Sequence, residues 1–212
     1  VLMEAKSPVI YVGQGVNYAE AWPQLKRLAE MLAIPVMSSL GGKSAFPENH
    51  PLSLGTGGIA MSLPLHEFLH KADVVFGIGC SFTETSFGVS MPKGPKIIHS
   101  TLEPTDLNKD VEADYALIGD AALTLDALLV QVEKELNGTP RDQKKVTEEI
   151  ARLRASWLEK WMPKLTSDQN PLSPYRVIWD LMHVVDRTKK IVTHEAGSPR
   201  DKTVPILSLI HI

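Results

Sequence analysis

The sequence predicts an α/β fold in which a parallel sheet carries helices on both faces. Two observations support this prediction. Short β-branched runs such as "SPVIYVGQG" and "DVVFGIG" alternate with helical segments, and both of these runs end in glycine. Strands that alternate with helices are typical of parallel sheets, whose buried strands are apolar throughout. A chain of 212 residues can hold one such domain and part of a second.

The first part of the chain contains two predicted strands, one helix and a long loop. "SPVIYVGQG" is a buried strand that enters a tight turn. Residues 18–33 follow as a helix whose apolar face comprises Trp22, Leu25, Leu28, Ala29 and Leu32. After the strand "IPVMSSL", the loop "GGKSAFPENHPLSLGTGG" is long for a compact domain, which indicates a functional role. Lys43 in this loop, like Lys109 further on, is expected to be a solvated charge.

The second part repeats the alternation and then changes character. Ser62 caps a helix over 62–72, which precedes the strand "DVVFGIG". Two short strands, "PKIIHS" and "YALIG", lead to a helix over 121–136, capped by Asp120 and expected to bury Leu123, Leu128 and Val132. A helix over 146–161 carries an apolar stripe that should pack on another element: Ile150, Leu153, Trp157 and Trp161. "YRVIWDLMHVV" and "KKIVTHEAG" then predict a helix and a strand of a second α/β unit.

Composition excludes several classes of protein. With 43% hydrophobic and 22% charged residues, the chain has an ordinary globular composition. Its net charge of −3 provides no basic footprint, so we expect no nucleic-acid partner. No apolar run approaches the roughly 18 residues of a membrane span, so we expect no membrane partner either. A single cysteine, Cys80, precludes an internal disulfide and fits a cytoplasmic location.

"HEFLH" matches the H-E-x-x-H pattern of zinc metalloproteases, in which two histidines on one helical face bind the metal. The apolar face of this helix, however, is formed by Leu65, Phe68 and Leu69. That arrangement leaves His66 and His70 on the flank, turned towards solvent. We therefore expect a helix that covers the sheet, and no metal site.

Two glycine-bearing strand ends are candidate nucleotide sites. Gly13 and Gly15 give half of a dinucleotide fingerprint, but Tyr18 occupies the third position and no acidic residue follows about 20 positions later. A nicotinamide dehydrogenase is therefore disfavoured, which leaves a nucleotide site or a simple tight turn. "GIGCS" is the second strand end. Its Cys80 is either a nucleophile or, as we favour, a small buried thiol.

A longer resemblance covers most of the chain. "SPVIYVGQGV", "IPVMSSLGGKSAFPENHPLSLGTGG", "KADVVFGIGCSFTE", "KIIHSTLEPTDLNKD" and "LIGDAALTLDALL" closely resemble the central, Rossmann-like domain of thiamine diphosphate-dependent enzymes of the acetolactate synthase and pyruvate oxidase group. This resemblance runs from about residue 7 to residue 136. "NPLSPYRVIWDLMHVV" and "IVTHEAGSPRD" resemble the opening of the diphosphate-binding domain of that family, extending the match to about residue 205.

The resemblance implies a division of the chain. We expect a central Rossmann-like domain over residues 1–137, a helical linker over 138–170 and the truncated start of the diphosphate-binding domain over 171–206. The last six residues, 207–212 ("LSLIHI"), equal the translation of CTG TCT CTT ATA CAC ATC, the end of a widely used transposase sequencing adapter. We therefore expect those six residues to be adapter read-through from a metagenomic fragment.

The resemblance also implies a function. The full-length parent would be a thiamine diphosphate- and Mg²⁺-dependent 2-oxo acid decarboxylase or carboligase, a transferase or lyase. Its substrate would be pyruvate or a related acid, and it would form a homo-oligomer, a dimer or a tetramer. The fragment would be inactive alone, without catalytic residues, because the catalytic glutamate and the magnesium motif of the family are missing. The alternative is a non-catalytic nucleotide-binding or structural domain with a vestigial site.

Family positions that approach cofactors can be matched residue by residue. For FAD or another nucleotide they are Gly13, Gly15, Ser39, Leu40, Gly57, Gly58, Gly79 and Glu103. For the thiamine diphosphate they are Gly197 and Ser198, and the preceding His194 and Glu195 have no assigned role. The sequence departs from the family at "GTGG", where "GMHG" is usual, and at Ser81, which replaces the arginine that would pair with a flavin diphosphate.

Overall fold

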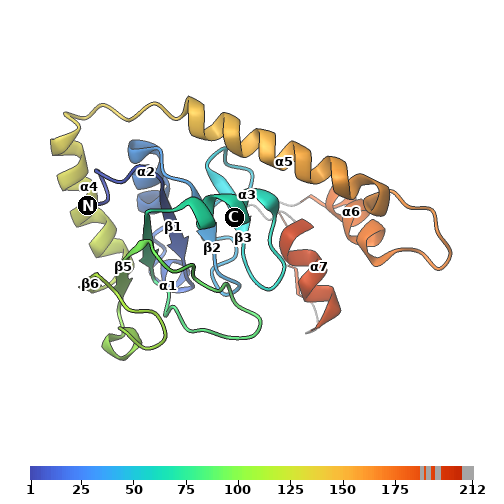
Figure 1. Cartoon of the computed structure of the whole chain (residues 1–212), viewed down its shortest axis with the longest axis horizontal. Helices are drawn as coiled ribbons and strands as arrows, with labels where there is room; N and C mark the ends of the chain where they lie inside the picture. Colours follow the sequence, from blue (N-terminus) through green and yellow to red (C-terminus); the bar gives the residue numbers. More distant parts are fainter. Residues whose placement is uncertain (187–188, 190–191, 194–196, 207–212) are drawn as a thin grey trace.

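The computed structural model describes residues 1–186, 189, 192–193 and 197–206. Figure 1 shows a sheet domain at one side of the molecule and a long helix, α5 (Lys144–Leu165), that runs from it to the last two helices. None of the described helices is both long and apolar enough to cross a membrane.

One six-stranded sheet forms the centre of the domain, in the order β3-β2-β1-β4-β5-β6. Every strand pair is parallel, which confirms the predicted fold class. The chain first adds strands on one side of β1, namely β2 and β3, and then on the other side, beginning with β4. α/β proteins bind ligands at the carboxyl ends of the strands where the strand order changes in this way. The strands are β1 (Pro8–Val12), β2 (Val36–Ser38), β3 (Ser53–Thr56), β4 (Val74–Ile78), β5 (Lys96–Thr101) and β6 (Tyr115–Ile118).

The edge strand β3 corrects the prediction of an uninterrupted loop between β2 and the next helix. It pairs with β2 across an irregular register next to Val36, and its Gly55 has a φ of 88°. Two side chains satisfy carbonyls of this edge strand: Arg154 donates to the Ser53 carbonyl at 2.7 Å, and Ser62 donates to that of Leu54 at 3.1 Å. Covering an edge in this way prevents unwanted strand pairing.

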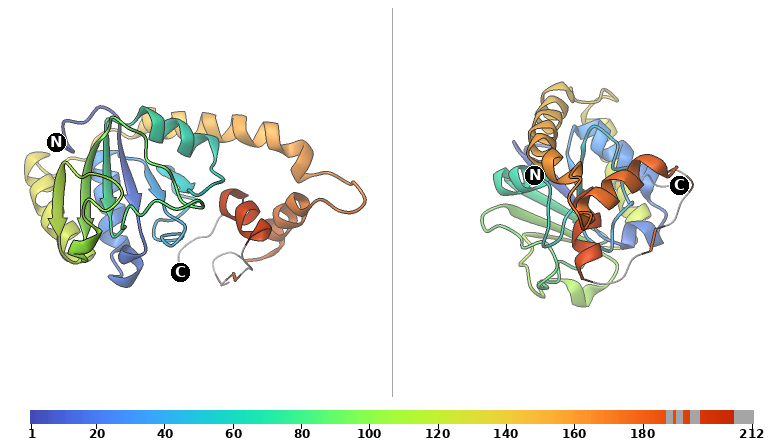
Figure 2. Two further views of the ribbon diagram at one scale, coloured as in Figure 1. Left: turned by 60° about the horizontal axis from the view of Figure 1, so that its bottom comes forward. Right: turned by 90° about the vertical axis from the view of Figure 1, so that its right-hand side faces the viewer.

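Helices cover both faces of the sheet (Figure 2). Alternate residues of β1 point to opposite faces, so Ile10 belongs to one core and Val9 to the other. The first core is closed by α2 (Trp22–Leu32) and α4 (Ala121–Glu135). The second core is closed by α3 (Leu63–Lys71) and by the start of α5. The sheet is therefore buried on both sides, as its apolar strands require.

Two details of the predicted helices are wrong. The helix expected over 18–33 begins later, at Trp22, because a separate short helix, α1 (Gly15–Tyr18), ends first and Glu20 adopts a positive φ of 51° before α2. On α4, Leu123 is 71% exposed rather than buried. Asp120 does cap this helix, but its buried face follows the spacing of Leu125, Leu129 and Val132. An apolar residue on the outer face of a helix cannot be recognised from hydrophobicity alone.

The second half of α5 leaves the sheet and packs on α6 (Pro174–Val184) and α7 (Ser198–Ile206), as the left view of Figure 2 shows. A third cluster joins these helices, which confirms that the apolar stripe of α5 packs on other elements: Trp157, Trp161, Leu165, Ile178, Trp179 and Ile206. The helix predicted from "YRVIWDLMHVV" is α6. Most of the predicted strand "KKIVTHEAG", including His194 and Glu195, and the expected adapter segment 207–212 lie outside the described residues.

Candidate functional site

A cleft of about 540 Å³ opens at the carboxyl edge of the sheet, where the loops after β1, β2, β4, β5 and β6 meet. We call it the strand-end cleft. Its walls bring together six of the residues that the sequence singles out: Gly13, Gly15, Ser39, Leu40, Gly79 and Glu103. Their convergence follows from the topology, because parallel strands place all their carboxyl ends at one edge.

The other four singled-out positions do not line this cleft. Gly57 follows β3, and a Cβ atom there would lie 2.5 Å from a methyl group of Val89, so its role is close packing. Gly58 also follows β3, and a Cβ atom there would lie 3.0 Å from the side chain of Leu40, which follows β2. Gly197 forms a turn with a φ of 87°, and Ser198 begins α7, which does not contribute to the strand-end cleft.

The glycines of the strand-end cleft allow two turns to touch through their backbones. A Cβ atom on Gly13 would lie 2.1 Å from the Gly79 carbonyl oxygen, and one on Gly15 would lie 2.8 Å from the Gly79 Cα. Gly79 itself has a φ of 60°, a conformation that side chains disfavour. These glycines are therefore required by contact between the turns after β1 and β4.

The backbone amides of these glycines already have partners within the protein. Gly13 donates to the Ile78 carbonyl at 3.0 Å, Gly15 to that of Gly79 at 2.8 Å, and Gly79 to that of Ser100 at 2.9 Å. In a dinucleotide site such amides are directed at the diphosphate. Here they stabilise the turns instead, so they offer nothing to an anion.

The charge of the strand-end cleft also opposes a diphosphate. Its lining contains three carboxylates and, among the described residues, no lysine or arginine: Glu103, Asp106 and Asp120. Hydrogen bonds from the Thr105 amide, at 3.1 Å, and hydroxyl, at 2.9 Å, lower the pKa of Glu103, which stays ionised. Lys109 only reaches the rim, through Thr83 at 3.4 Å.

Ser81 shows why the missing arginine matters. Its hydroxyl lies 2.8 Å from that of Thr83, so this position provides a local hydrogen bond and no positive charge. With occupied amides and acidic walls, the residues present do not fit a dinucleotide diphosphate such as that of FAD. Uncharged hydroxyl or ring groups are compatible with the same lining.

Two aromatic residues, Tyr11 and Phe82, line the floor of the strand-end cleft, and the buried His99 packs behind Phe82, a feature that sequence patterns did not reveal. The rings of Tyr11 and Phe82 lie 5.5 Å apart, and those of Phe82 and His99 lie 4.8 Å apart. His99 Nε2 lies 2.8 Å from the Cys80 carbonyl oxygen, a hydrogen bond in which the imidazole is the donor. Burial raises the pKa of Cys80 to about 12, so it is an inert thiol, as we expected, and not a nucleophile.

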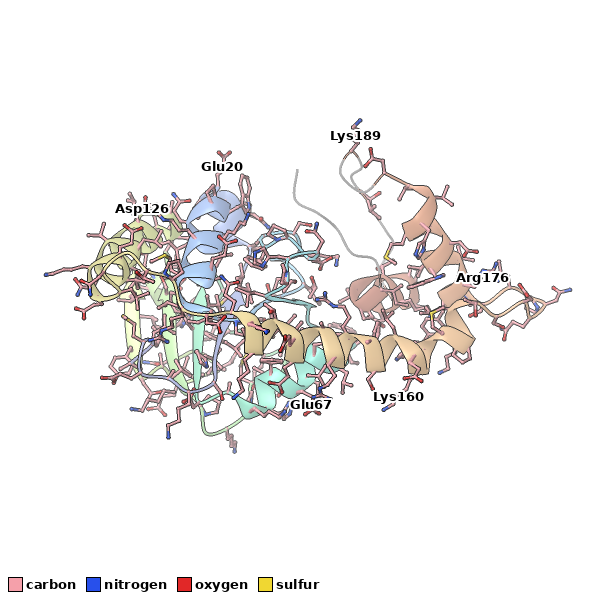
Figure 3. All side chains as sticks on the ribbon, turned by 90° about the horizontal axis from the view of Figure 1, so that it is seen from above. Glu20, Glu67, Asp126, Lys160, Arg176 and Lys189 are labelled. Carbon is pink, nitrogen blue, oxygen red and sulfur yellow. The ribbon has the colours of Figure 1, made fainter. Side chains whose placement is uncertain are left out.

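The histidines of "HEFLH" flank α3 as expected, with Leu65 and Leu69 buried beneath them. The two imidazole rings stack with their centroids 4.1 Å apart, and Lys71 pairs with Glu67 at 3.6 Å. Figure 3 shows Glu67 on the outer side of α3, beside α5. Within the described ranges, no group of three or more side chains is arranged to hold a metal ion.

A buried ionic network in the loop after β2 corrects the expectation that Lys43 is solvated. The Lys43 side chain is only 17% exposed, and its Nζ lies 2.7 Å from Oε1 of Glu48. Thr56 donates to the same oxygen at 2.7 Å, and Lys43 also reaches the Val204 carbonyl of α7 at 3.5 Å. The network therefore ties the sheet domain to the last described helix.

Comparisons with known proteins place this geometry in a family. Residues 1–128 match the family model described as thiamine pyrophosphate enzyme, central domain. The chain is 32% identical to a probable acetolactate synthase large subunit of Methanococcus aeolicus over 93% of its length, and 34% identical to that of Methanocaldococcus jannaschii, again over 93%. It is 35% identical over 92% of its length to the acetolactate synthase isozyme 3 large subunit of Escherichia coli.

These alignments extend beyond the central-domain match, through α5 and into the last helices. The chain nevertheless spans only about a third of the length of these curated relatives, 33–34% of each.

Proposed function

Because the chain belongs to the thiamine pyrophosphate enzyme family, as its central domain, we propose that the protein containing it is a thiamine diphosphate-dependent 2-oxo acid decarboxylase or carboligase of the acetolactate synthase type. The observation that carries this proposal is the alignment of 92–93% of the chain with large subunits of that name. The six-stranded parallel sheet supports it, because it is consistent with the central domain whose family model residues 1–128 match. The comparisons do not favour a non-catalytic domain with a vestigial site.

The proposed division assigns residues 1–137 to the central domain, 138–170 to a linker and 171–206 to the start of the diphosphate-binding domain. The long α5 and the third hydrophobic cluster support a boundary of this kind. None of the described residues is assigned a catalytic role. Thiamine diphosphate, bound with Mg²⁺ in the whole protein, would supply the electron sink that allows the bond between the substrate carbonyl carbon and the carboxylate to break.

Gly197 and Ser198 fit a neighbour of the thiamine diphosphate. The turn at Gly197 opens α7, and the positive end of the helix dipole at that point favours an anion. Lys202 lies one turn further on, hydrogen bonded to the Ser198 hydroxyl, and its positive charge offsets the negative charge of the neighbouring Asp201. These residues would help to position the cofactor diphosphate, whereas the Mg²⁺ ligands would come from other parts of the protein.

We propose that the strand-end cleft holds no flavin. Its three carboxylates and its internally bonded amides support this proposal, although the family resemblance implies FAD at these positions in flavin-containing members. The central domain would then serve to support the catalytic domains rather than to bind a redox cofactor.

The substrate would be pyruvate or a related 2-oxo acid, and the protein would act as a homo-oligomer in the cytoplasm. The proposed oligomer is supported by apolar side chains that are exposed in the single chain and that a second subunit would cover. They lie on the edge strand β6 and on the outer side of α4: Tyr115, Ile118, Leu123 and Val130. The reduced, buried Cys80 fits the proposed compartment.

The test is an assay of the protein encoded by the complete reading frame. Purified protein should release CO₂ from pyruvate, and omitting either thiamine diphosphate or Mg²⁺ should abolish the release. Turnover that persists without thiamine diphosphate, or no turnover on a panel of 2-oxo acids, would remove the proposal.

A further inference from the structure

A second cavity, of about 360 Å³, lies between the sheet domain and the helices α5, α6 and α7. We call it the junction pocket. It is separate from the strand-end cleft, with which it shares no lining residue. Its volume lies in the range of small-molecule sites in proteins, roughly 300–1,000 Å³.

Most of the wall of the junction pocket is apolar and aromatic. Two indole rings, one from α5 and one from α6, contribute to it together with aliphatic side chains from β3, α5, α6 and α7: Leu54, Trp157, Leu158, Trp179, Met182 and Ile206. Indole rings provide large, rigid apolar surfaces that recognise flat ligands. The occupant should therefore have an apolar body.

The polar side of the junction pocket contains Arg154 and Glu48. One N–H of Arg154 donates to the Ser53 carbonyl at 2.7 Å, and a guanidinium has five donors in all. Glu48 is already held by Lys43, at 2.7 Å, and by Thr56, also at 2.7 Å. Lys43 does not line the pocket, but it neutralises Glu48 from behind, so these three described side chains together carry one excess positive charge.

The position of Arg154 strengthens its attraction for an anion. Burial lowers the pKa of Arg154, the nearby Glu48 carboxylate opposes that shift, and a guanidinium remains protonated at neutral pH. A partly buried charge is screened less than one at the surface. The fork of N–H donors matches a carboxylate, which Arg binds in a bidentate manner.

We propose that the junction pocket binds a small amphipathic monocarboxylate, with its apolar body against Trp157 and Trp179 and its carboxylate on Arg154. One excess positive charge suits one negative charge, and the apolar wall disfavours a strongly hydrated dianion such as phosphate. The site is independent of the family activity, because it involves neither the strand-end cleft nor Gly197 and Ser198.

The first test compares two ligands of the same shape on the unchanged 212-residue chain. Calorimetric titration with 4-phenylbutyrate should give saturable binding of one ligand per chain. Its neutral amide, 4-phenylbutyramide, should bind about tenfold more weakly or worse, because the charge-assisted hydrogen bond is lost. Equal affinities, or titrations of the acid that do not saturate, would overturn the proposal.

The second test changes the protein. Arg154→Gln should weaken 4-phenylbutyrate binding about tenfold or more and leave the amide unaffected. Arg152→Gln is the matched control, because Arg152 is exposed on the same helix and lines no part of the junction pocket. Unchanged affinity in a folded Arg154→Gln protein would overturn the proposal. If that variant does not fold, the comparison of acid and amide on the unchanged chain still decides.

Discussion

A Cβ atom on Gly13 would lie 2.1 Å from the carbonyl oxygen of Gly79, so the turns after β1 and β4 meet backbone to backbone. Gly13 stands in the turn after the first strand, where dinucleotide-binding proteins place glycines that approach a diphosphate. In this chain Gly13 and Gly79 shape the floor of the strand-end cleft, and their amides are bonded to neighbouring carbonyls. Glycine at these sites is thus explained by packing, without a bound phosphate.

Gly13→Ala should destabilise the chain by about 2–3 kcal/mol, because the added methyl group meets backbone atoms that cannot move without shifting a turn. Urea unfolding measures this change. Gly119→Ala is the matched control, since Gly119 lines the same cleft and its nearest atom is the Thr124 hydroxyl, at 3.2 Å. That variant should change stability by less than about 0.5 kcal/mol. Equal losses would contradict the packing role of Gly13.

The acidic lining of the strand-end cleft predicts its ligand preference. ADP should bind to the chain no more tightly than adenosine, because the added diphosphate faces Glu103, Asp106 and Asp120. Equilibrium dialysis of both compounds provides the comparison. An affinity for ADP about tenfold higher than for adenosine would show that the lining accepts a diphosphate after all.

The Cys80 thiol should resist alkylation in the folded chain. Burial raises its pKa from an ordinary 9.0 to about 12, which lowers the thiolate population at mildly alkaline pH about a thousandfold. Iodoacetamide should therefore modify Cys80 about a thousandfold more slowly in native buffer than in concentrated urea, as followed by mass spectrometry. Comparable rates in the two conditions would mean that the thiol is accessible and ionised.

The Lys43–Glu48 pair should contribute more to stability than exposed pairs do. Lys43→Met removes the cation that is hydrogen bonded to the buried Glu48 carboxylate and leaves it with Thr56 and the nearby Arg154, at a cost of about 2 kcal/mol. Lys26→Met is the control. Lys26 lies 4.0 Å from Glu30 on the surface, and its loss should cost less than about 0.5 kcal/mol. Thermal unfolding of both variants measures the difference, and similar melting temperatures would contradict the buried network.

Asp73 should make stability depend on pH at the acidic end. Burial tends to raise its pKa, but hydrogen bonds from the Lys6 amide, at 2.7 Å, and the Ser7 amide, at 2.9 Å, outweigh this effect and lower it. A folded-state pKa below the unfolded value contributes stability above the unfolded pKa, and this stability is lost as pH falls through the folded pKa.

Asp73→Asn should therefore lower stability at neutral pH by about 1 kcal/mol, a value reduced for solvent screening. The difference from the unchanged chain should shrink below about pH 4. Asp126→Asn is the control, because Asp126 lies on the outer surface of α4 (Figure 3). Urea unfolding as a function of pH tests both, and a loss that is constant with pH would contradict the role of the carboxylate.

Features with a local or periodic signal could be predicted from the sequence alone. Five of the strands, the cap formed by Asp120, and the buried side of α3 follow from apolar runs, a capping residue and helical spacing. The convergence of six singled-out residues on one cleft follows from parallel topology.

Other features depend on contacts between segments far apart in the chain. Strand β3 is short and contains Gly55, so only its pairing with β2 and its cover by Arg154 reveal it. Lys43 is only 17% exposed because it pairs with Glu48, and it also contacts Val204 of α7, 161 residues away in the chain, which no local pattern encodes. The aromatic floor around Phe82 likewise arises from side chains of separate strands.

The measurement that tests the central claim most directly is calorimetric titration of thiamine diphosphate into the protein encoded by the complete reading frame. We predict saturable binding of one cofactor per chain in the presence of Mg²⁺, and loss of binding when the ion is chelated. Absence of saturable binding in a folded, Mg²⁺-containing sample would contradict the assignment of this chain to a functional thiamine diphosphate-dependent enzyme.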